Sequence, residues 1–444
     1  ANTIVGKNAM CNNTSGTCNV AIGFCALVAN TTCLENTAVG SFALCKNTSG
    51  NNAALGGYAG FGNTSGYANV YVGHLTGCCN STGYQNTFLG SQAGRSISAG
   101  VNDVTIVGYA AGCVNQCSRI TAVGSSALQA NTTGACNSAL GYKALFKNTT
   151  ANNNTALGLC AMLCNTEGCQ NVAVGRSMNK NCCGSDNTAV GYLALDCNVD
   201  GSNNTVVGSQ ALNFNTTSNN TAMGYGAAYC STGCQNTAIG SLALRGTCTS
   251  SGTKNVAVGY TALCKVTTGA LNVAVGANAL KCNTSSCSST AIGYNSLLNN
   301  TAASNTGVGK DTLEANTSGG NNTAVGADAL AANTTANSNT AVGRLALLSN
   351  TEGSHNVGLG INTLYCNTCG DYNTAIGNCA LAATTSDQNT AVGYQALVDN
   401  TSGDCNVAVG AFSLYCNTTS DYNVAVGRTA LRNNTCSLNV GIGY

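Results

Sequence analysis

The sequence contains no proline and no tryptophan, and only 7% of its 444 residues are charged. An ordinary soluble protein has roughly 25% charged residues, so this chain has few side chains that could bind phosphate groups. Its 16 basic and 15 acidic residues give a net charge of +1. Because nucleic acids and anionic membranes both require clustered Lys and Arg, we expect neither as a partner.

Long apolar runs are also missing. No segment approaches the ~20 consecutive apolar residues of a membrane-spanning helix, so the sequence predicts no membrane span. Residue 1 already lies inside a repeated unit and no signal peptide precedes it, so we expect a processed chain or part of a longer one.

Groups suited to catalysis are sparse as well. The two histidines, His74 and His355, are far apart in the sequence, and the acidic residues recur singly at turn positions such as Asp371, Asp404 and Asp421. A glycine-rich stretch at 56–62 opens no helix, so it is not a phosphate-binding loop. The sequence therefore predicts neither an enzyme nor a cofactor or metal site.

What the chain does contain is one repeated phrase. Asn-Thr-Ala-Val-Gly occurs at 36–40, 187–191, 322–326 and 389–393, and related phrases end in Gly throughout the sequence. Taking that Gly as position 0 of each copy, we find 27 copies spaced 16 to 19 residues apart, most often 17. A short, sustained period is typical of repeat architectures, so we predict one array over residues 1–444.

The repeat predicts short strands. Position −1 is aliphatic in every copy and position −3 is nearly always Thr or Val, which favour strands. Alternate strand residues share a face, so we assign −1 and −3 to the core. Position −2 is Ala in 19 of the 27 copies. This column of small apolar residues on the second face predicts that another surface packs against it, and so favours an oligomer or a second layer.

The positions beside the strand are equally regular. Asn occupies −4 in 24 copies, and such residues can form an amide ladder when coils stack. The Gly at 0 is suited to a positive φ, and Leu at +4 to a second core position. Four copies between residues 57 and 112 instead have Gly at +4 and two have an aromatic residue at −2, so 57–112 is a variant segment with an expected narrower coil.

These features together predict an all-β fold. We expect a β-solenoid or β-roll of about 27 coils of roughly 17 residues.

The phrase Asn-Thr-Ala-Val-Gly-Tyr-Gln-Ala-Leu at 389–397, followed by Asn400-Thr-Ser-Gly and Asn406-Val-Ala-Val-Gly, resembles repeat arrays of phage tail-fibre-like proteins and of bacterial or large-virus surface proteins. It is also similar to the head repeats of trimeric autotransporter adhesins, which carry an Asn-Ser-Val-Ala-Ile-Gly phrase. The resemblance implies a trimeric β-roll on a cell or virion surface. The period near 17 is longer than that of the adhesin heads, and those heads lack this cysteine content.

The 28 cysteines, in a chain without clustered His and acidic residues, favour disulfides and an oxidising compartment over metal binding or redox catalysis. The protein is therefore expected to be extracellular or surface-displayed. Five pairs that each span one turn are the disulfide candidates: Cys11 and Cys18, Cys113 and Cys117, Cys230 and Cys234, Cys282 and Cys287, and Cys366 and Cys369. Other pairs, such as Cys405 with Cys416, could link neighbouring coils.

Thirteen Asn-x-Ser/Thr sequences fall at position +7 and are candidates for N-linked glycans on exposed turns. The alternative is that Asn and Thr are simply suited to turns. The candidate residues are Asn13, Asn30, Asn47, Asn63, Asn80, Asn131, Asn148, Asn215, Asn283, Asn316, Asn333, Asn400 and Asn417.

Three functions are compatible with this pattern. The first is the structural shaft of an extracellular filament, fibre or surface appendage, self-associated as a homotrimer or filament. The second is an adhesin or receptor-binding fibre that contacts host or cell-surface glycans, to which Tyr residues at position +1 could contribute, although we expect these rings to cover the edge of the core. The third is an ice-binding solenoid built on its Thr column, which the assignment of that column to the core opposes.

Overall fold

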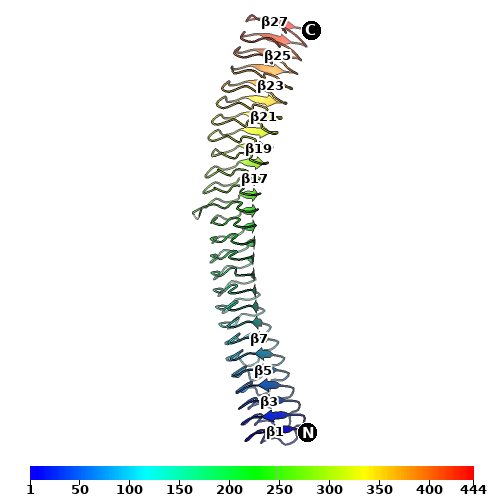
Figure 1. Ribbon diagram of the computed structural model, residues 1–444, viewed down its shortest axis with the longest axis vertical. Helices are drawn as coiled ribbons and strands as arrows, with labels where there is room; N and C mark the ends of the chain where they lie inside the picture. The colour runs from blue at the N-terminus through cyan, green and yellow to red at the C-terminus, as the bar shows by residue number, and fades with distance from the viewer. Residues whose placement is uncertain (248) are drawn as a thin grey trace. The chain divides into compact units, whose positions relative to one another are not determined.

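The computed structural model describes residues 1–247 and 249–444, and the described residues contain no helix. They form two compact units, Ala1–Asn220 and Thr221–Tyr444, each of which is a β-solenoid. The predicted all-β repeat fold is thus confirmed. In both units one three-residue strand per coil stacks on the strand of the next coil (Figure 1).

The first unit contains thirteen strands, and each pairs in parallel with the next. They are β1 (Thr3–Val5), β2 (Val20–Ile22), β3 (Thr37–Val39), β4 (Ala53–Leu55), β5 (Val70–Val72), β6 (Thr87–Leu89), β7 (Thr105–Val107), β8 (Thr121–Val123), β9 (Ser138–Leu140), β10 (Thr155–Leu157), β11 (Val172–Val174), β12 (Thr188–Val190) and β13 (Thr205–Val207).

The second unit contains fourteen strands paired in the same way. They are β14 (Thr221–Met223), β15 (Thr237–Ile239), β16 (Val256–Val258), β17 (Val273–Val275), β18 (Thr290–Ile292), β19 (Thr306–Val308), β20 (Thr323–Val325), β21 (Thr340–Val342), β22 (Val357–Leu359), β23 (Thr374–Ile376), β24 (Thr390–Val392), β25 (Val407–Val409), β26 (Val424–Val426) and β27 (Val440–Ile442).

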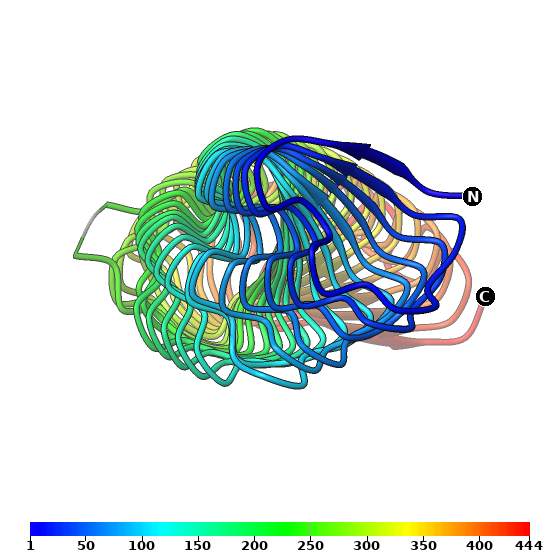
Figure 2. The same ribbon diagram turned by 90° about the horizontal axis from the view of Figure 1, so that it is seen from below.

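The register of the strands follows the repeat. Position −2 of each strand lies beside position −2 of the next, as Ala156 lies beside Ala173. Equivalent residues of successive coils therefore form columns along each unit, and the coils overlie one another when a unit is viewed end on (Figure 2). Each coil adds one rung of about 4.8 Å to its unit.

The interior of each coil is narrow. Position −2 is buried in every strand from β2 to β26, whereas positions −1 and −3 are buried in none. The core consists of this Ala column together with Ala at +3 and Leu at +4, as in Ala38, Ala43 and Leu44. The prediction that −1 and −3 face the core is therefore wrong, and the two faces are exchanged.

The physical reason is the distance between the walls of a coil. Where −2 is large, the opposite wall must lose its side chain: a Cβ on Gly77 would lie 2.5 Å from the ring of Tyr71, and one on Gly112 would lie 2.6 Å from Cδ1 of Ile106. Two walls this close leave room for Ala facing Leu but not for a column of Val and Ile. The four Gly residues at +4 in segment 57–112 thus compensate for larger residues at −2.

Two columns of buried Asn side chains connect the coils. At −4, Asn137 Nδ2 donates to the carbonyl of Ala151, and Asn137 Oδ1 accepts the main-chain N–H of Asn154 at 2.9 Å. At +7, Asn148 Nδ2 donates to Asn131 Oδ1 at 2.7 Å. The amide ladder predicted at −4 is confirmed, and the second ladder satisfies polar groups inside the turn, where lost hydrogen bonds are costly.

The turns use left-handed backbone conformations at three non-glycine positions per coil. Positions −5, +2 and +4 have positive φ, as in Glu35 (φ 58°), Phe42 (φ 58°) and Leu44 (φ 47°). The Gly at 0 has a positive φ, as predicted, and a Cβ on Gly90 would lie 2.7 Å from the carbonyl oxygen of Gly108. Only Gly fits where successive corners approach this closely.

Candidate functional site

The outward positions −1 and −3 of the strands form the strand face of each unit. Position −1 carries Val, Ile, Leu or Met in all strands, and position −3 carries Thr or Val except at Ala53 and Ser138. Between the first and last strands, exposure at −1 reaches 52% at Leu55 and 48% at Leu140. Neither column contains a charged residue. A continuous apolar surface of this kind marks an interaction site in soluble proteins.

The strand face also carries hydroxyl groups. Position −3 is Thr in 16 of the 27 strands. Among the described residues, no hydrogen bond joins the hydroxyl of a strand Thr to another atom of the chain, whereas turn residues such as Thr132 donate from Oγ1 to the next coil. These strand hydroxyls are available to water or to a partner at every rung that carries Thr.

Most of the predicted glycosylation residues are not on exposed turns. Asn13 is half-buried, and the twelve others are fully buried members of the +7 ladder. Asn131 Nδ2, for example, donates to Asn115 Oδ1 and to the carbonyl of Gly134. The expectation of an exposed stripe at +7 is therefore corrected, because these side chains point into the turn and bond to its carbonyl groups and to one another. The burial favours the alternative that these residues serve the turn.

Among the described residues, Cys230 is buried and the other cysteines are exposed or half-buried. The structure holds Cys11, Cys18, Cys113, Cys117, Cys282, Cys287, Cys366 and Cys369 as free thiols, so the bonds predicted for these four pairs are not present in it. Cys230 is disulfide-bonded and Cys234 is a free thiol, so the bond of Cys230 is not to Cys234. The two inter-coil candidates Cys405 and Cys416 are also free thiols.

Two pairs of adjacent cysteines bring their sulfur atoms together. The Sγ atoms of Cys182 and Cys183 are 3.3 Å apart, and those of Cys78 and Cys79 are 3.9 Å apart. Burial raises the pKa of Cys78 to about 11, and the neighbouring Cys79 adds to the shift. At neutral pH the Cys78 thiol is therefore uncharged. The sequence-based list of disulfide candidates omitted both pairs, although adjacent cysteines are visible in the sequence.

The acidic turn residues are aligned rather than isolated. Asp371 Oδ1 accepts the N–H of Ser354, and Asp387, Asp404 and Asp421 each accept the N–H of the Asp one coil earlier at 2.8 Å. The period predicts this alignment, because all four occupy position −6. Among the described residues, no three His, Cys, Asp or Glu side chains converge as metal ligands.

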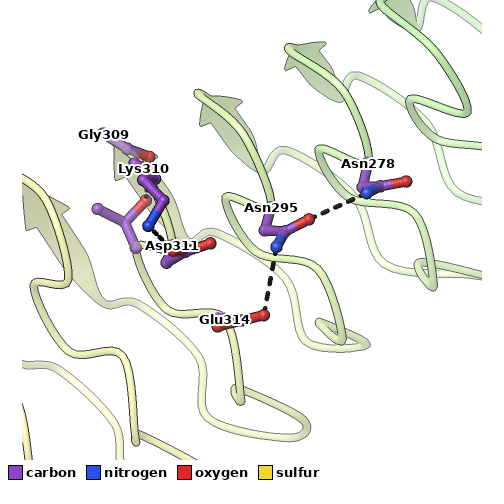
Figure 3. A network of polar contacts seen from close by, with 7 residues as sticks. Asn278, Asn295, Gly309, Lys310, Asp311 and Glu314 are labelled. Carbon is purple, nitrogen blue, oxygen red and sulfur yellow. Dashed lines mark hydrogen bonds and ion pairs between the residues drawn. The ribbon is translucent and has the colours of Figure 1, made fainter.

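A polar surface column in the second unit uses residues at +2 (Figure 3). Asn278 Nδ2 donates to Asn295 Oδ1 at 3.0 Å, and Asn295 Nδ2 contacts Glu314 at 3.4 Å. On the neighbouring coil, Lys310 Nζ forms an ion pair with the adjacent Asp311 at 2.8 Å. One oxygen of Asp311 is buried without a partner, while Lys310 is 64% exposed, so the column is partly solvated and contains no closed polar site.

Aromatic residues are more exposed than expected. Tyr residues at +1 are 47% to 58% exposed at Tyr109, Tyr142, Tyr192, Tyr225, Tyr260, Tyr294 and Tyr394. About half of each of these residues is open to water, so none of the seven belongs to the buried core. The histidines also lie on turns, and His355 stacks on Tyr372 at 4.8 Å.

The described surface has two notable hollows, both lined by turn residues. One, of about 280 Å³, includes Cys366 and Cys379 of neighbouring coils in its lining. The larger one, of about 520 Å³, lies in the first unit between Lys46 and Cys79 and has Tyr58 and Phe61 in its wall. This groove was not predicted from the sequence. Its signals were the glycine-rich stretch at 56–62 and the lack of any Asp or Glu from residue 36 to residue 102.

No helix in the described ranges has the length and hydrophobicity to cross a bilayer.

Comparison of the chain with protein-family models finds no match, and comparison with curated proteins also finds none. The similarity to tail-fibre and adhesin-head repeats therefore depends on the recurring phrase, to which the structure adds a solenoid of parallel strands.

Proposed function

We propose that this protein is a structural shaft of an extracellular filament, fibre or surface appendage, and that copies associate through their strand faces. The observation that carries the proposal is the aliphatic column at −1, which is continuous within each unit and buried in none of its strands. Covering this column removes apolar area from water at roughly 25 cal/mol per Å².

The internal ladders support a load-bearing role. Main-chain hydrogen bonds, the Ala and Leu columns and two Asn ladders connect most coils to their neighbours in the same direction. In such stacks each unit contacts only adjacent units, and stability comes from repeated nearest-neighbour interfaces.

The proposed location outside the cell follows from the cysteine content. Disulfides persist in oxidising compartments, and the exposed and half-buried turn cysteines are accessible for cross-linking there. Homotrimeric assembly is the form implied by the resemblance to adhesin heads. Glycan attachment is a separate part of the proposal and is tested below.

The self-association proposal is tested with two lysines on the strand face. Val325→Lys and Val342→Lys in one chain place charges on adjacent rungs of β20 and β21, at positions that are not buried. The matched control, Ser318→Lys with Thr335→Lys, places two lysines on exposed turns of the same coils. Native mass spectrometry and sedimentation measure the number of chains.

We expect oligomers for the unsubstituted protein and the control, and association at least tenfold weaker for the strand-face variant with an unchanged circular-dichroism spectrum. A tenfold change corresponds to about 1.4 kcal/mol. A monomeric unsubstituted protein at micromolar concentration, or equal effects of the two double variants, would refute association through this face.

A second candidate function is ice binding, favoured by the outward Thr column. The sequence-based assignment of the Thr column to the core opposed ice binding. In the structure this column lies on the surface instead. Thr hydroxyl and methyl groups occupy 16 of the 27 rungs, with consecutive runs at β12–β15 and β18–β21, beside an aliphatic column without charge. Within such a run the groups are spaced by about 4.8 Å. Such an array could match an ordered water lattice.

Thermal hysteresis distinguishes the two candidates. An ice-binding face must be open to water, so hysteresis should be present in the monomer, should be abolished by Thr323→Lys with Thr340→Lys, and should persist in the Ser318→Lys and Thr335→Lys control. No hysteresis at millimolar protein concentration dismisses this candidate and leaves the shaft proposal in place.

The adhesin alternative needs a concave site with groups that recognise a glycan. The groove beside Phe61 is the strongest candidate for such a site.

A further inference from the structure

The groove is formed by three consecutive coils of the first unit. Its lining comes from positions +2, +5, +6 and +8 of these coils, and its volume is about 520 Å³. A hollow of this size lies in the range of small-molecule sites, which are typically lined by aromatic residues with a few polar groups. The lining residues are Lys46, Tyr58, Phe61, Gly62, Thr64, Leu75, Cys78, Cys79 and Ser81.

The hollow has a sequence origin at position +6. Lys46 and Cys79 occupy this position on the outer two coils, and Gly62, which has no side chain, occupies it on the middle coil. A Cβ on Gly62 would collide with the carbonyl oxygen of Cys78, so the close stacking of these coils requires Gly here. The missing side chain of Gly62 leaves a notch between the ammonium group of Lys46 and the thiol of Cys79.

Aromatic rings form one wall of the notch. Tyr58 and Phe61 lie with their ring centroids 5.6 Å apart, and Phe42 contacts both of them, stacked on Tyr58 at 5.0 Å and edge-on to Phe61 at 6.3 Å. Tyr58 is 38% exposed, so part of this wall faces water. Exposed rings beside a hollow are suited to the C–H face of a sugar ring, since they offer apolar contact with defined geometry.

The charge of the groove is positive. Lys46 Nζ lies 4.9 Å from the centroid of Phe61. Residues 36–102 contain no Asp or Glu, while Arg95 is close enough to lower the pKa of Cys78 against the larger effect of burial. No ion pair involves Lys46 among the described residues. The ammonium group is therefore held beside the hollow without a carboxylate partner.

We infer that this groove binds an acidic sugar residue of a polysaccharide, with the sugar ring against Tyr58 and Phe61 and its carboxylate at Lys46. Single-stranded nucleic acid also combines stacking with negative charge, but its backbone requires a row of cations. Here one lysine borders the notch, which matches one carboxylate. The inference does not depend on the shaft proposal, because it concerns the turn side of the coil and not the strand face.

The test measures binding of hexagalacturonate to the full chain by isothermal titration calorimetry, with fully methyl-esterified hexagalacturonate as the uncharged match. Lys46→Gln removes the cation and Phe61→Leu removes the ring. The control is Lys147→Gln, since Lys147 is also an exposed lysine at +6, on a coil in which +4 is Leu145. Circular dichroism verifies that each variant is folded.

We expect hexagalacturonate to bind with a Kd below ~1 mM. Lys46→Gln and Phe61→Leu should each raise the Kd at least tenfold, Lys147→Gln should leave it unchanged, and the esterified sugar should bind at least tenfold more weakly. The inference is overturned by an absence of binding at ~1 mM, by an equal loss in Lys147→Gln, by equal binding of the esterified sugar, or by tighter binding of oligothymidylate.

Discussion

The ring of Phe88 occupies the space that a side chain on Gly94 would need. A Cβ on Gly94 would lie 2.7 Å from both Cδ1 and Cε1 of Phe88, which is closer than carbon atoms can approach. Gly94 has a φ of +56°, close to the φ of +47° at Leu44, which occupies the same position in an ordinary coil. The exchange of Leu for Gly at +4 is therefore a response to volume rather than to backbone conformation.

This relationship predicts that two damaging substitutions compensate each other. Phe88→Ala should leave a cavity and cost about 3–5 kcal/mol, and Gly94→Leu should overpack the coil and cost about 1–3 kcal/mol or more. The double variant recreates the Ala and Leu pair of ordinary coils. It should be more stable than the sum of the single effects by at least about 1 kcal/mol. Hydrogen exchange at the Gly94 amide, which donates to Ala111, measures this locally.

If the double variant exchanges as fast as the sum of the two single effects requires, Phe88 and Gly94 are not coupled. Phe88→Leu serves as a milder control, because it removes part of the ring volume while leaving Gly94 unchanged. Local exchange is the suitable measurement, since a long repeat array need not unfold in a single cooperative step.

The sequence predicted the repeat, the strands and their register, because β-branched residues and a Gly recur at one spacing. It did not predict which strand face is inside, since alternation assigns Val39 and Ala38 to opposite faces without saying which is core. The smallness of Ala38 was the available signal, and it reflects the narrow coil. Nothing in the sequence predicted the positive φ of Leu44, because Leu rarely adopts the left-handed conformation.

The groove and the buried turn residues were missed for a related reason. Asn at +7 reads as an exposed turn residue in any local pattern, and only the stacking of coils turns its side chain inward. Similarly, Gly62 is unremarkable until Lys46 and Cys79 are placed on either side of it. The period of the sequence predicts which residues form a column. Whether the side chains of that column point into the coil or outward depends on how the coil closes.

The −4 ladder predicts a large local cost for Asn322→Ala. Asn322 Nδ2 donates to the carbonyl of Ala336 at 2.8 Å, and its Oδ1 accepts the N–H of Asn339 at 2.9 Å. Alanine leaves the N–H of Asn339 buried without a partner, at about 1–3 kcal/mol. The carbonyl of Ala336 keeps its second donor, Asn333 Nδ2 at 3.1 Å. Hydrogen exchange at Asn339 should accelerate by at least tenfold.

The matched control is Asn378→Ala, because Asn378 is exposed at position +1 and no described hydrogen bond involves its side chain. Asn322→Asp should be worse than Asn322→Ala near neutral pH, since it keeps the acceptor, removes the donor and buries a charge. Equal exchange rates in the Asn322 and Asn378 variants would show that the ladder contributes little.

Asp196 predicts a pH-dependent gain from a single substitution. Its carboxylate is 9% exposed and has one buried oxygen without a partner. Burial raises its pKa above the ordinary value, against the opposing effects of Lys180 and Arg176. The folded state therefore holds the proton more tightly than the unfolded state. The stability contributed by protonated Asp196 is lost as pH rises from the pKa of the unfolded carboxyl through the raised pKa of the folded one.

Asp196→Asn should consequently stabilise the first unit at pH 7 and should lose most of this advantage at a pH below about 3.9, where the unfolded carboxyl is also protonated. Thermal melting of the two proteins between pH 3 and pH 7 measures the difference. An advantage that is independent of pH would assign the effect to packing, and a destabilised variant at pH 7 would assign Asp196 a favourable ion pair with Lys180 or Arg176.

The buried +7 ladder predicts where N-linked glycans can occur in the folded protein. Asn131 is fully buried and its Nδ2 makes two hydrogen bonds, so a glycan on this atom is incompatible with closure of the coil. The sequence also contains Asn12-Asn13-Thr14 and Asn299-Asn300-Thr301, whose first Asn residues are exposed. Folded, secreted protein from a glycosylating host should therefore carry glycans at Asn12 or Asn299 and none at Asn131.

Peptide mapping after enzymatic deglycosylation in heavy-oxygen water measures occupancy at each site, because each released glycan leaves a labelled Asp. The exposed sites serve as internal controls for the enzyme and the host. Occupied Asn131 in protease-resistant material would mean that the coil tolerates an outward Asn at +7, and the second ladder would then not be required for folding. Occupancy confined to misfolded, protease-sensitive chains is the expected result, since attachment before folding blocks the turn.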